Sequence, residues 1–215
     1  MKTYILISSI ILALVILVAF YSFRHDTREM FTPSQCDSLS ASTFLDQSSL
    51  SYGLTAAQQQ EILNTHNLRR AQHGEKPLKW NENLAKTAND WFSKSCAFSH
   101  STTLPYGENL IAGYHYPPCD MWYTAEACAL DFSNPTFNAG HTSAILWSST
   151  TDVGCALITK DNCPNGIADT GSSERFTHMI ACEYSPPGNI HGQFKDNLHA
   201  PLVPLKCVNG QVVDS

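Results

Sequence analysis

The cysteines set the strongest limit on what this chain can fold into and where. All eight follow an N-terminal apolar segment: Cys36, Cys96, Cys119, Cys128, Cys155, Cys163, Cys182 and Cys207. An even number of cysteines in that position is typical of disulfides formed in an oxidising compartment. A zinc cluster built on thiolates is disfavoured, because the sequence has no Cys-x-x-Cys pair. The pattern predicts a disulfide-stabilised domain outside the cytosol.

The N-terminal segment indicates how the chain reaches that compartment. Residues 3–23 carry no charged side chain, and about 20 apolar residues suffice to span a bilayer. A cleaved signal has small residues at its cut site, whereas Phe20, Tyr21 and Phe23 are bulky. We expect residues 1–23 to be a transmembrane signal anchor with the C-terminal domain extracellular or lumenal. The alternative is a cleaved signal peptide and a secreted protein.

Charge and composition bound the rest of the chain. The 13 basic residues are outnumbered by 19 acidic ones, and the only adjacent basic pair is Arg69–Arg70, so nucleic acid is not expected as a partner. Residues 24–53 are rich in Ser, Thr, Asp and Gln, which is typical of a flexible stalk. We expect one domain at residues 54–207 and a tail at residues 208–215.

Helical spacing of apolar residues indicates four helices. Thr55 and Gln58 match a capping box that begins the first, which runs to about residue 72. Asn81 can cap the second. The inner face of this second helix is expected to hold Leu84, Ala88 and Trp91. The third covers about residues 120–130, and the fourth begins near residue 140.

Beyond residue 150 the helical spacing gives way to alternation. In residues 152–159 and in residues 175–184, the side chains at alternate positions are mostly apolar and would lie on one face of an extended strand. Two strands are therefore expected, joined by a loop that contains Cys163.

Several side chains could carry chemistry, but none is informative alone. They are His66, His100, Glu108, Glu126, His141 and His178, together with the hydroxyls of Thr142 and Ser143. A single histidine is more often a hydrogen-bonded structural residue than a ligand. Only their combination with neighbouring residues can indicate a site.

Four motifs supply that combination. They are HNLRR at residues 66–70, GENL at 107–110, GHTSAILWSST at 140–150 and MIACEYSPPGN at 179–189. Together they resemble the cysteine-rich secretory, antigen 5 and pathogenesis-related superfamily, called CAP, over roughly residues 54–192. The resemblance implies an α+β fold: a three-layer α-β-α sandwich with a small, mostly antiparallel sheet, stabilised by disulfides.

The resemblance also implies a cleft with two histidines and two glutamates. The matching residues are His100, Glu108, Glu126 and His141. Two neutral imidazoles and two carboxylates suit a divalent ion of borderline softness, so we expect weak, reversible zinc binding with open coordination positions. Without an ion, two facing carboxylates would share a proton or have one pKa raised.

The chain departs from the family pattern at three places. Family members usually have Trp three residues before the second glutamate, where this chain has Tyr123, with Trp122 displaced by one. Thr142 stands where an aromatic residue is common, and we expect it to widen or polarise the cleft edge. Ala139 replaces a cysteine, which removes one family disulfide.

The resemblance implies two disulfides, Cys155–Cys182 and Cys96–Cys163. The four remaining cysteines allow three pairings. Of these we select Cys119–Cys128 with Cys36–Cys207.

Three classes of function fit these features. Residues 130–138 resemble a loop with which family members hold sterols, with Phe132 and Phe137 as lipid contacts; alternatively, both rings belong to the core. A non-enzymatic binding module for sterol or another lipid, or for an extracellular protein partner, is favoured. A metal-assisted hydrolase is one alternative, although a triad of Ser143 and His141 is not expected, because adjacent helical side chains diverge. A displayed host-interaction or immune-modulating domain without lipid binding is the other.

Overall fold

A computed structural model of the chain describes residues 50–113 and 116–213. The expected signal anchor at residues 1–23 and residues 24–49 of the expected stalk lie outside them. Among the described residues, no helix has both the length and the apolar character needed to cross a bilayer.

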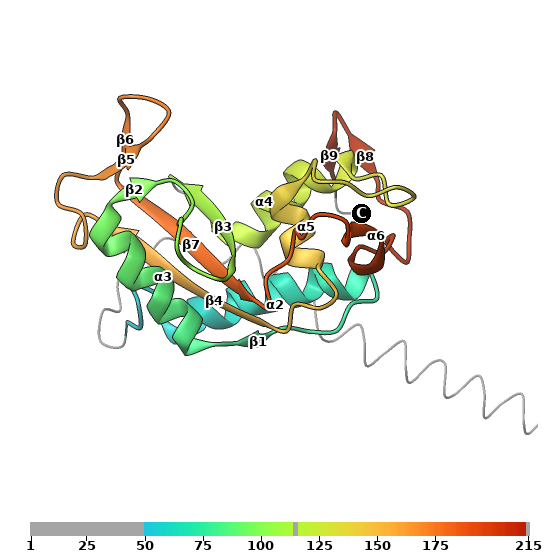
Figure 1. Cartoon of the computed structure of the whole chain (residues 1–215), viewed down its shortest axis with the longest axis horizontal. Coiled ribbons are helices and arrows are strands. Elements are labelled where there is room, and N and C mark those ends of the chain that lie inside the picture. The colour runs from blue at the N-terminus through green and yellow to red at the C-terminus, as the bar shows by residue number, and fades with distance from the viewer. Residues whose placement is uncertain (1–49, 114–115, 214–215) are drawn as a thin grey trace, which may run out of the picture. The chain divides into compact units, whose positions relative to one another are not determined.

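A four-stranded sheet forms the middle layer, in the order β1-β4-β7-β3. Strand β1 (Lys79–Trp80) runs parallel to β4 (Asp152–Thr159). Strand β7 (His178–Ser185) pairs antiparallel with both β4 and β3 (Gly107–Ala112). The two predicted strands are thus the central pair, and β3, which sequence analysis did not predict, is an edge strand (Figure 1).

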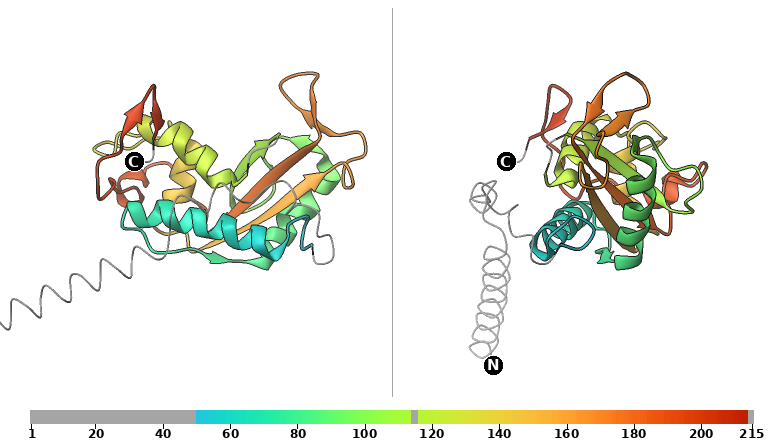
Figure 2. Two further views of the ribbon diagram at one scale, coloured as in Figure 1. Left: turned by 180° about the vertical axis from the view of Figure 1, so that it is seen from behind. Right: turned by 90° about the vertical axis from the view of Figure 1, so that its left-hand side faces the viewer.

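Helices cover both faces of this sheet and confirm the three-layer α+β architecture (Figures 1 and 2). Helix α3 (Glu82–Ser95) packs on one face. Helices α2 (Ala56–Gln72), α4 (Pro118–Glu126) and α5 (Gly140–Leu146) form the layer on the other. Alternation along β4 and β7 divides the apolar side chains between two cores, because successive strand residues point to opposite faces.

Local signals placed the helix starts correctly. Thr55 and Gln58 form the reciprocal capping box at α2, and Asn81 caps α3. The expected inner face of α3 is incomplete: Phe92 is fully buried, whereas Trp91 is half-buried and packs against the same core. Phe92 lies one helical turn beyond Ala88, so it continues the stripe that faces the sheet.

Smaller elements complete the domain. The 3-10 helix η4 (Ala127–Ala129) follows α4, and the short helix α6 (Phe194–Asn197) lies near the C-terminus. A side sheet combines β2 (Ala97–Phe98), β5 (Ile167–Asp169) and β6 (Arg175–Phe176). The predicted strand at 175–184 is therefore divided between β6 and β7.

Ordered structure extends past both expected edges of the domain. Before residue 54, the carbonyl of Tyr52 accepts a hydrogen bond from the amide of Leu157 in β4. After residue 207, β8 (Cys207–Val208) and β9 (Gln211–Val212) form a hairpin in which Val212 is buried.

Three disulfides join the described residues. Cys96–Cys163 and Cys155–Cys182 are the two that the resemblance implies. The third is Cys128–Cys207, so the selected pairs Cys119–Cys128 and Cys36–Cys207 are wrong. Cys119 is a buried free thiol in the first turn of α4. Nine residues of helical rise, about 13 Å, separate it from Cys128, which is beyond the reach of a disulfide. Cys36 lies outside the described residues.

His66 is part of the core rather than the cleft. Its Nδ1 lies 2.7 Å from the carbonyl oxygen of Ile62, and its Nε2 lies 2.8 Å from the hydroxyl of Tyr184. Burial lowers the pKa of His66 to about 4.

We predict that acid destabilises the domain through His66. In the unfolded chain this imidazole gains a proton near its ordinary pKa of 6.5, whereas in the fold it stays neutral down to about 4. Protons are therefore bound preferentially by the unfolded state, and stability is lost as the pH falls through this window, by up to about 3 kcal/mol. Denaturant unfolding at pH 7 and pH 4.5 measures the loss. His66→Gln should remove this part of the pH dependence, and an identical dependence in both proteins would contradict the assignment.

Candidate functional site

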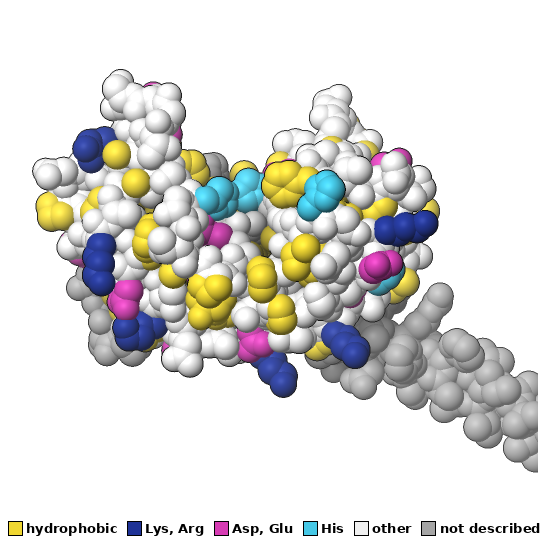
Figure 3. All heavy atoms as spheres, viewed as in Figure 1, with side chains coloured by type: hydrophobic (Ala, Val, Ile, Leu, Met, Phe, Trp, Pro, Cys, Tyr) yellow, Lys and Arg dark blue, Asp and Glu magenta, His cyan; other side chains and the backbone are white. Residues whose placement is uncertain are grey.

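A cleft of about 460 Å³ opens at the start of edge strand β3. Segments distant in sequence line it: His100, Gly107, Glu108, Asn109, Phe137, Gly140, His141, Ala144, Gly188 and Asn189. The surface view shows histidine side chains near a hollow, with an acidic side chain just below one group of them (Figure 3). The cleft therefore contains three of the four residues that the resemblance assigns to the site.

His100 and Glu108 form the first pair. The Nδ1 atom of His100 lies 2.6 Å from Oε1 of Glu108, which also accepts the amide N–H of Ser101 at 3.1 Å. The His100 side chain is 65% exposed and that of Glu108 only 6%, so a buried carboxylate orients an exposed ring. The hydrogen bond to Glu108 raises the pKa of His100, although partial burial opposes it.

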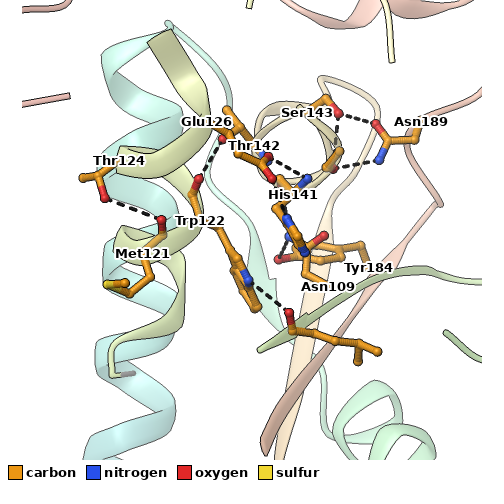
Figure 4. A network of polar contacts seen from close by, with 12 residues as sticks. Asn109, Met121, Trp122, Thr124, Glu126, His141, Thr142, Ser143, Tyr184 and Asn189 are labelled. Atoms are coloured by element: carbon orange, nitrogen blue, oxygen red, sulfur yellow. Dashed lines mark hydrogen bonds and ion pairs between the residues drawn. The ribbon is translucent and has the colours of Figure 1, made fainter. Parts of the chain in front are cut away.

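His141 and Glu126 form the second pair. Again Nδ1 lies 2.6 Å from Oε1. The other carboxylate oxygen of Glu126 accepts the amide N–H groups of His141 and Thr142, both at 3.0 Å (Figure 4). Burial alone would raise the pKa of Glu126, but the hydrogen bonds from His141 and Thr142 lower it. Glu126 thus caps the start of α5 and orients the imidazole, and it does so from outside the cleft lining.

The position of His141 is further fixed by its neighbours. The Trp122 indole stacks on the imidazole with ring centroids 5.7 Å apart and planes 3° from parallel. The side-chain amide of Asn109 donates to the carbonyl of His141 at 3.0 Å (Figure 4). The tryptophan that is displaced by one residue therefore still contacts the site, while Tyr123 bonds to His73 instead.

The four predicted residues thus form two histidine–glutamate pairs rather than one cluster. Glu108 and Asn109 are successive residues of β3, so their side chains leave opposite faces of the strand. Glu108 meets His100 on one side, and Asn109 meets His141 on the other. Over residues 50–113 and 116–213, no three His, Cys, Asp or Glu side chains are grouped so that they could hold a metal ion.

Glu183 is a site neighbour that sequence analysis missed. It pairs directly with Glu108 across β3 and β7 and is fully buried. Burial raises the pKa of Glu183, and the charge of Glu108 raises it further, so Glu183 keeps its proton. The facing carboxyl groups are therefore Glu108 and Glu183, not Glu108 and Glu126. The available signal was that Glu183 shares its face of the predicted strand with the apolar residues Met179 and Ala181.

The remaining candidates have other contacts. His178 begins β7, where its Nδ1 lies 2.7 Å from the hydroxyl of Thr177. Thr142 is fully buried and donates to the carbonyl of Trp122, so it does not widen or polarise the cleft edge. The hydroxyl of Ser143 lies within hydrogen-bond distance of the carbonyl oxygen of Gly140 and of Oδ1 of Asn189.

The two phenylalanines of the predicted lipid loop differ in their surroundings. Phe132 packs on the core, with its ring 5.1 Å from that of His73. Phe137 is 68% exposed, lines the cleft and contacts Phe194. Only Phe137 presents an apolar ring to a ligand in the cleft.

The two imidazoles are the groups in the cleft that a divalent cation could bind. Each imidazole directs Nδ1 to a carboxylate. In metal-binding histidines this arrangement orients the ring and leaves Nε2 as the atom that can bind the metal ion. Two such nitrogens would leave the other coordination positions to water or a ligand.

We predict that Glu108→Gln lowers the pKa of His100. The amide lacks the charge and the acceptor strength that favour the protonated ring, so the titration midpoint should return toward 6.5. NMR titration of the imidazole protons measures it. Glu126→Gln serves as the control and should leave the His100 midpoint unchanged. An unchanged midpoint in Glu108→Gln would show that the hydrogen bond does not control this ring.

Comparison with known proteins identifies the family. Residues 63–184 match the family model described as the cysteine-rich secretory protein family, CAP. The chain is 38% identical to "Repressed by EFG1 protein 1" of Candida albicans, over 66% of this chain and 54% of that protein. It is 36% identical to Protein PRY2 of Saccharomyces cerevisiae over 64% of this chain and 40% of that protein, and 32% identical to Pathogenesis-related protein 1 of Arabidopsis thaliana over 63% and 80%. The chain thus spans about half the length of the first two relatives.

One solved structure shares this fold, and a second is similar over much of its length. The crystal structure of Na-ASP-1 superposes with a TM-score of 0.52 at 15% identity, covering 78% of this chain and 48% of that one. NaASP2, solved with Zn2+, gives a TM-score of 0.48 at 17% identity, covering 71% and 90%. The family model spans more than half of the chain and includes both histidine–glutamate pairs. This chain belongs to the cysteine-rich secretory protein family, the CAP family.

Proposed function

We propose that this chain is an extracellular binding module whose cleft holds a divalent cation weakly between Nε2 of His100 and Nε2 of His141. The proposal is based on one observation: the imidazole rings of His100 and His141 line the same cleft, and a carboxylate lies 2.6 Å from Nδ1 of each ring. Zinc is the expected ion, because imidazole nitrogen is among its preferred ligands. In this proposal residues 3–23 anchor the module in the membrane, or direct its secretion when they are cleaved.

The contacts of the two pairs support weak rather than structural binding. Two protein nitrogens are fewer than the four ligands of a structural zinc site. The ion would polarise a ligand group that occupies one of its open positions. A serine hydrolase receives less support, because the Ser143 hydroxyl is hydrogen-bonded to Gly140 and Asn189.

We predict that the full chain binds zinc in isothermal titration and that His100→Ala or His141→Ala abolishes the heat. Glu108→Gln and Glu126→Gln, which remove only the partners of Nδ1, should weaken binding about 10- to 100-fold. Binding should also weaken as the pH falls, beginning above 6.5, because the raised pKa of His100 protonates the donor early.

His199→Ala is the matched control. The Nδ1 atom of His199 also lies 2.6 Å from a glutamate, Glu75, but neither residue lines the cleft. This variant should bind zinc as the unchanged chain does. Absence of heat with the unchanged chain, or equal loss in His199→Ala, would refute the proposed cation site.

Lipid binding is a second candidate function, favoured by the exposed ring of Phe137 in the cleft. Burial of a sterol-sized apolar surface at about 25 cal/mol per Å² provides ample driving force. We predict that Phe137→Ala weakens binding of labelled sterol, whereas Phe132→Ala mainly lowers the denaturation midpoint, because Phe132 packs on the core. Sterol binding that depends on Phe132 and not on Phe137, with the fold intact, would contradict this role for the cleft.

A further inference from the structure

The wall of the cleft formed by β3 has main-chain hydrogen-bonding groups that the sheet does not use. Strand β3 is at the edge of the sheet, with β7 as its neighbour. The amide of Gly113, just beyond β3, donates to the carbonyl of His178 at 3.1 Å in the same register. Odd-numbered residues of β3 therefore direct their peptide groups toward β7, and even-numbered residues direct theirs outward.

A contact at Leu110 confirms that the peptide groups of even-numbered residues point outward. It also shows that the outward carbonyl of Leu110 already has a partner within the domain. The indole N–H of Trp122 donates to the outward carbonyl of Leu110 at 3.3 Å. At Glu108 the side chain bonds to His100 and Ser101. No residue in the described part of the chain bonds to the peptide N–H or C=O of Glu108, and Glu108 lines the cleft.

We propose that this edge binds a short extended peptide, which adds to β3 as a further antiparallel strand by pairing with Glu108. The inference rests on the proposed role of the cleft as a binding site, but not on the cation. Strand addition supplies affinity through main-chain hydrogen bonds and specificity through alternate side chains. Three extended residues span about 10 Å. The volume of about 460 Å³ lies in the usual range for ligand sites.

The two sides of the cleft determine which peptide fits. The peptide residue that pairs with Glu108 has its side chain on the same face of the sheet as that of Glu108. It therefore contacts the His100–Glu108 pair. An acidic residue is excluded there, because like charges directly opposite each other destabilise a strand pair, and a basic residue is favoured. The residues on either side of it share the face of Asn109, toward Ala144 and Phe137, where apolar side chains fit.

The probe is the capped peptide Ac-Ala-Leu-Lys-Leu-Ala-NH2, added to the full chain. Its lysine pairs with Glu108, and its leucines face Ala144 and Phe137. Binding should slow hydrogen exchange of the Glu108 amide, followed by NMR. The Asn109 amide, which already faces β7, is the internal control and should be unchanged.

N-methylation of the peptide tests the main-chain pairing directly. A methyl group on the lysine nitrogen removes the bond to the Glu108 carbonyl and should weaken binding about fivefold to tenfold. The same methyl group on the following leucine, whose N–H points away from β3, should change affinity by less than about twofold. Replacement of the lysine by glutamate should weaken binding at least as much as methylation of the lysine nitrogen.

Three results would overturn the inference: no binding of the parent peptide at millimolar concentration, equal binding of the two methylated peptides, or binding without protection of Glu108. Each titration is repeated with zinc. Zinc heat without peptide binding would refute the strand addition alone. Peptide binding without zinc heat would refute the cation site and leave the strand addition standing.

Discussion

The antiparallel pairing of β3 with β7 is the constraint from which the cleft follows. It sets Glu108 opposite Glu183 and, one residue later, directs Asn109 to the other face toward His141. Since Glu108 and Glu183 form a pair without mutual main-chain bonds, their side chains approach closely. One carboxyl keeps its proton, and the other remains an acceptor for His100. The same pairing leaves one edge of β3 unpaired at the cleft.

Glu126 shows how a structural and a functional role combine in one side chain. Its carboxylate accepts two amides at the start of α5 and the imidazole of His141. Helix α5 has only seven residues and no side-chain cap of its own, so the glutamate that terminates α4 stabilises its first turn. The imidazole direction is therefore coupled to the contact between two helices. The polar network in Figure 4 therefore both joins α4 to α5 and orients a side chain of the site.

Signals confined to a few neighbouring residues were sufficient for part of the fold. The caps at Thr55 and Asn81 were correct because a cap depends on residues within one turn. Strand β3 was missed because Gly107–Ala112 has a partly buried, irregular pattern without clear alternation. Phe92 was overlooked as a core residue because helical spacing from Leu84 and Ala88 allows both position 91 and position 92 on the inner face, and only the packing of α3 on the sheet distinguishes them. Of the site, four residues followed from the family resemblance, but not their grouping into two pairs.

Motifs and caps involve adjacent residues, so the amino-acid sequence was sufficient to predict the family, the disulfide-rich character of the domain and the identities of His100, Glu108, Glu126 and His141. Tertiary structure alone decided that Cys128 bonds to Cys207, that Glu183 faces Glu108, and that Phe137 rather than Phe132 lines the cleft. These outcomes depend on the register of the strands and on the axial rise of a helix, which bring together Cys128 and Cys207, 79 positions apart, and separate near neighbours such as Cys119 and Cys128. Distance in space, not distance along the chain, controls each of them.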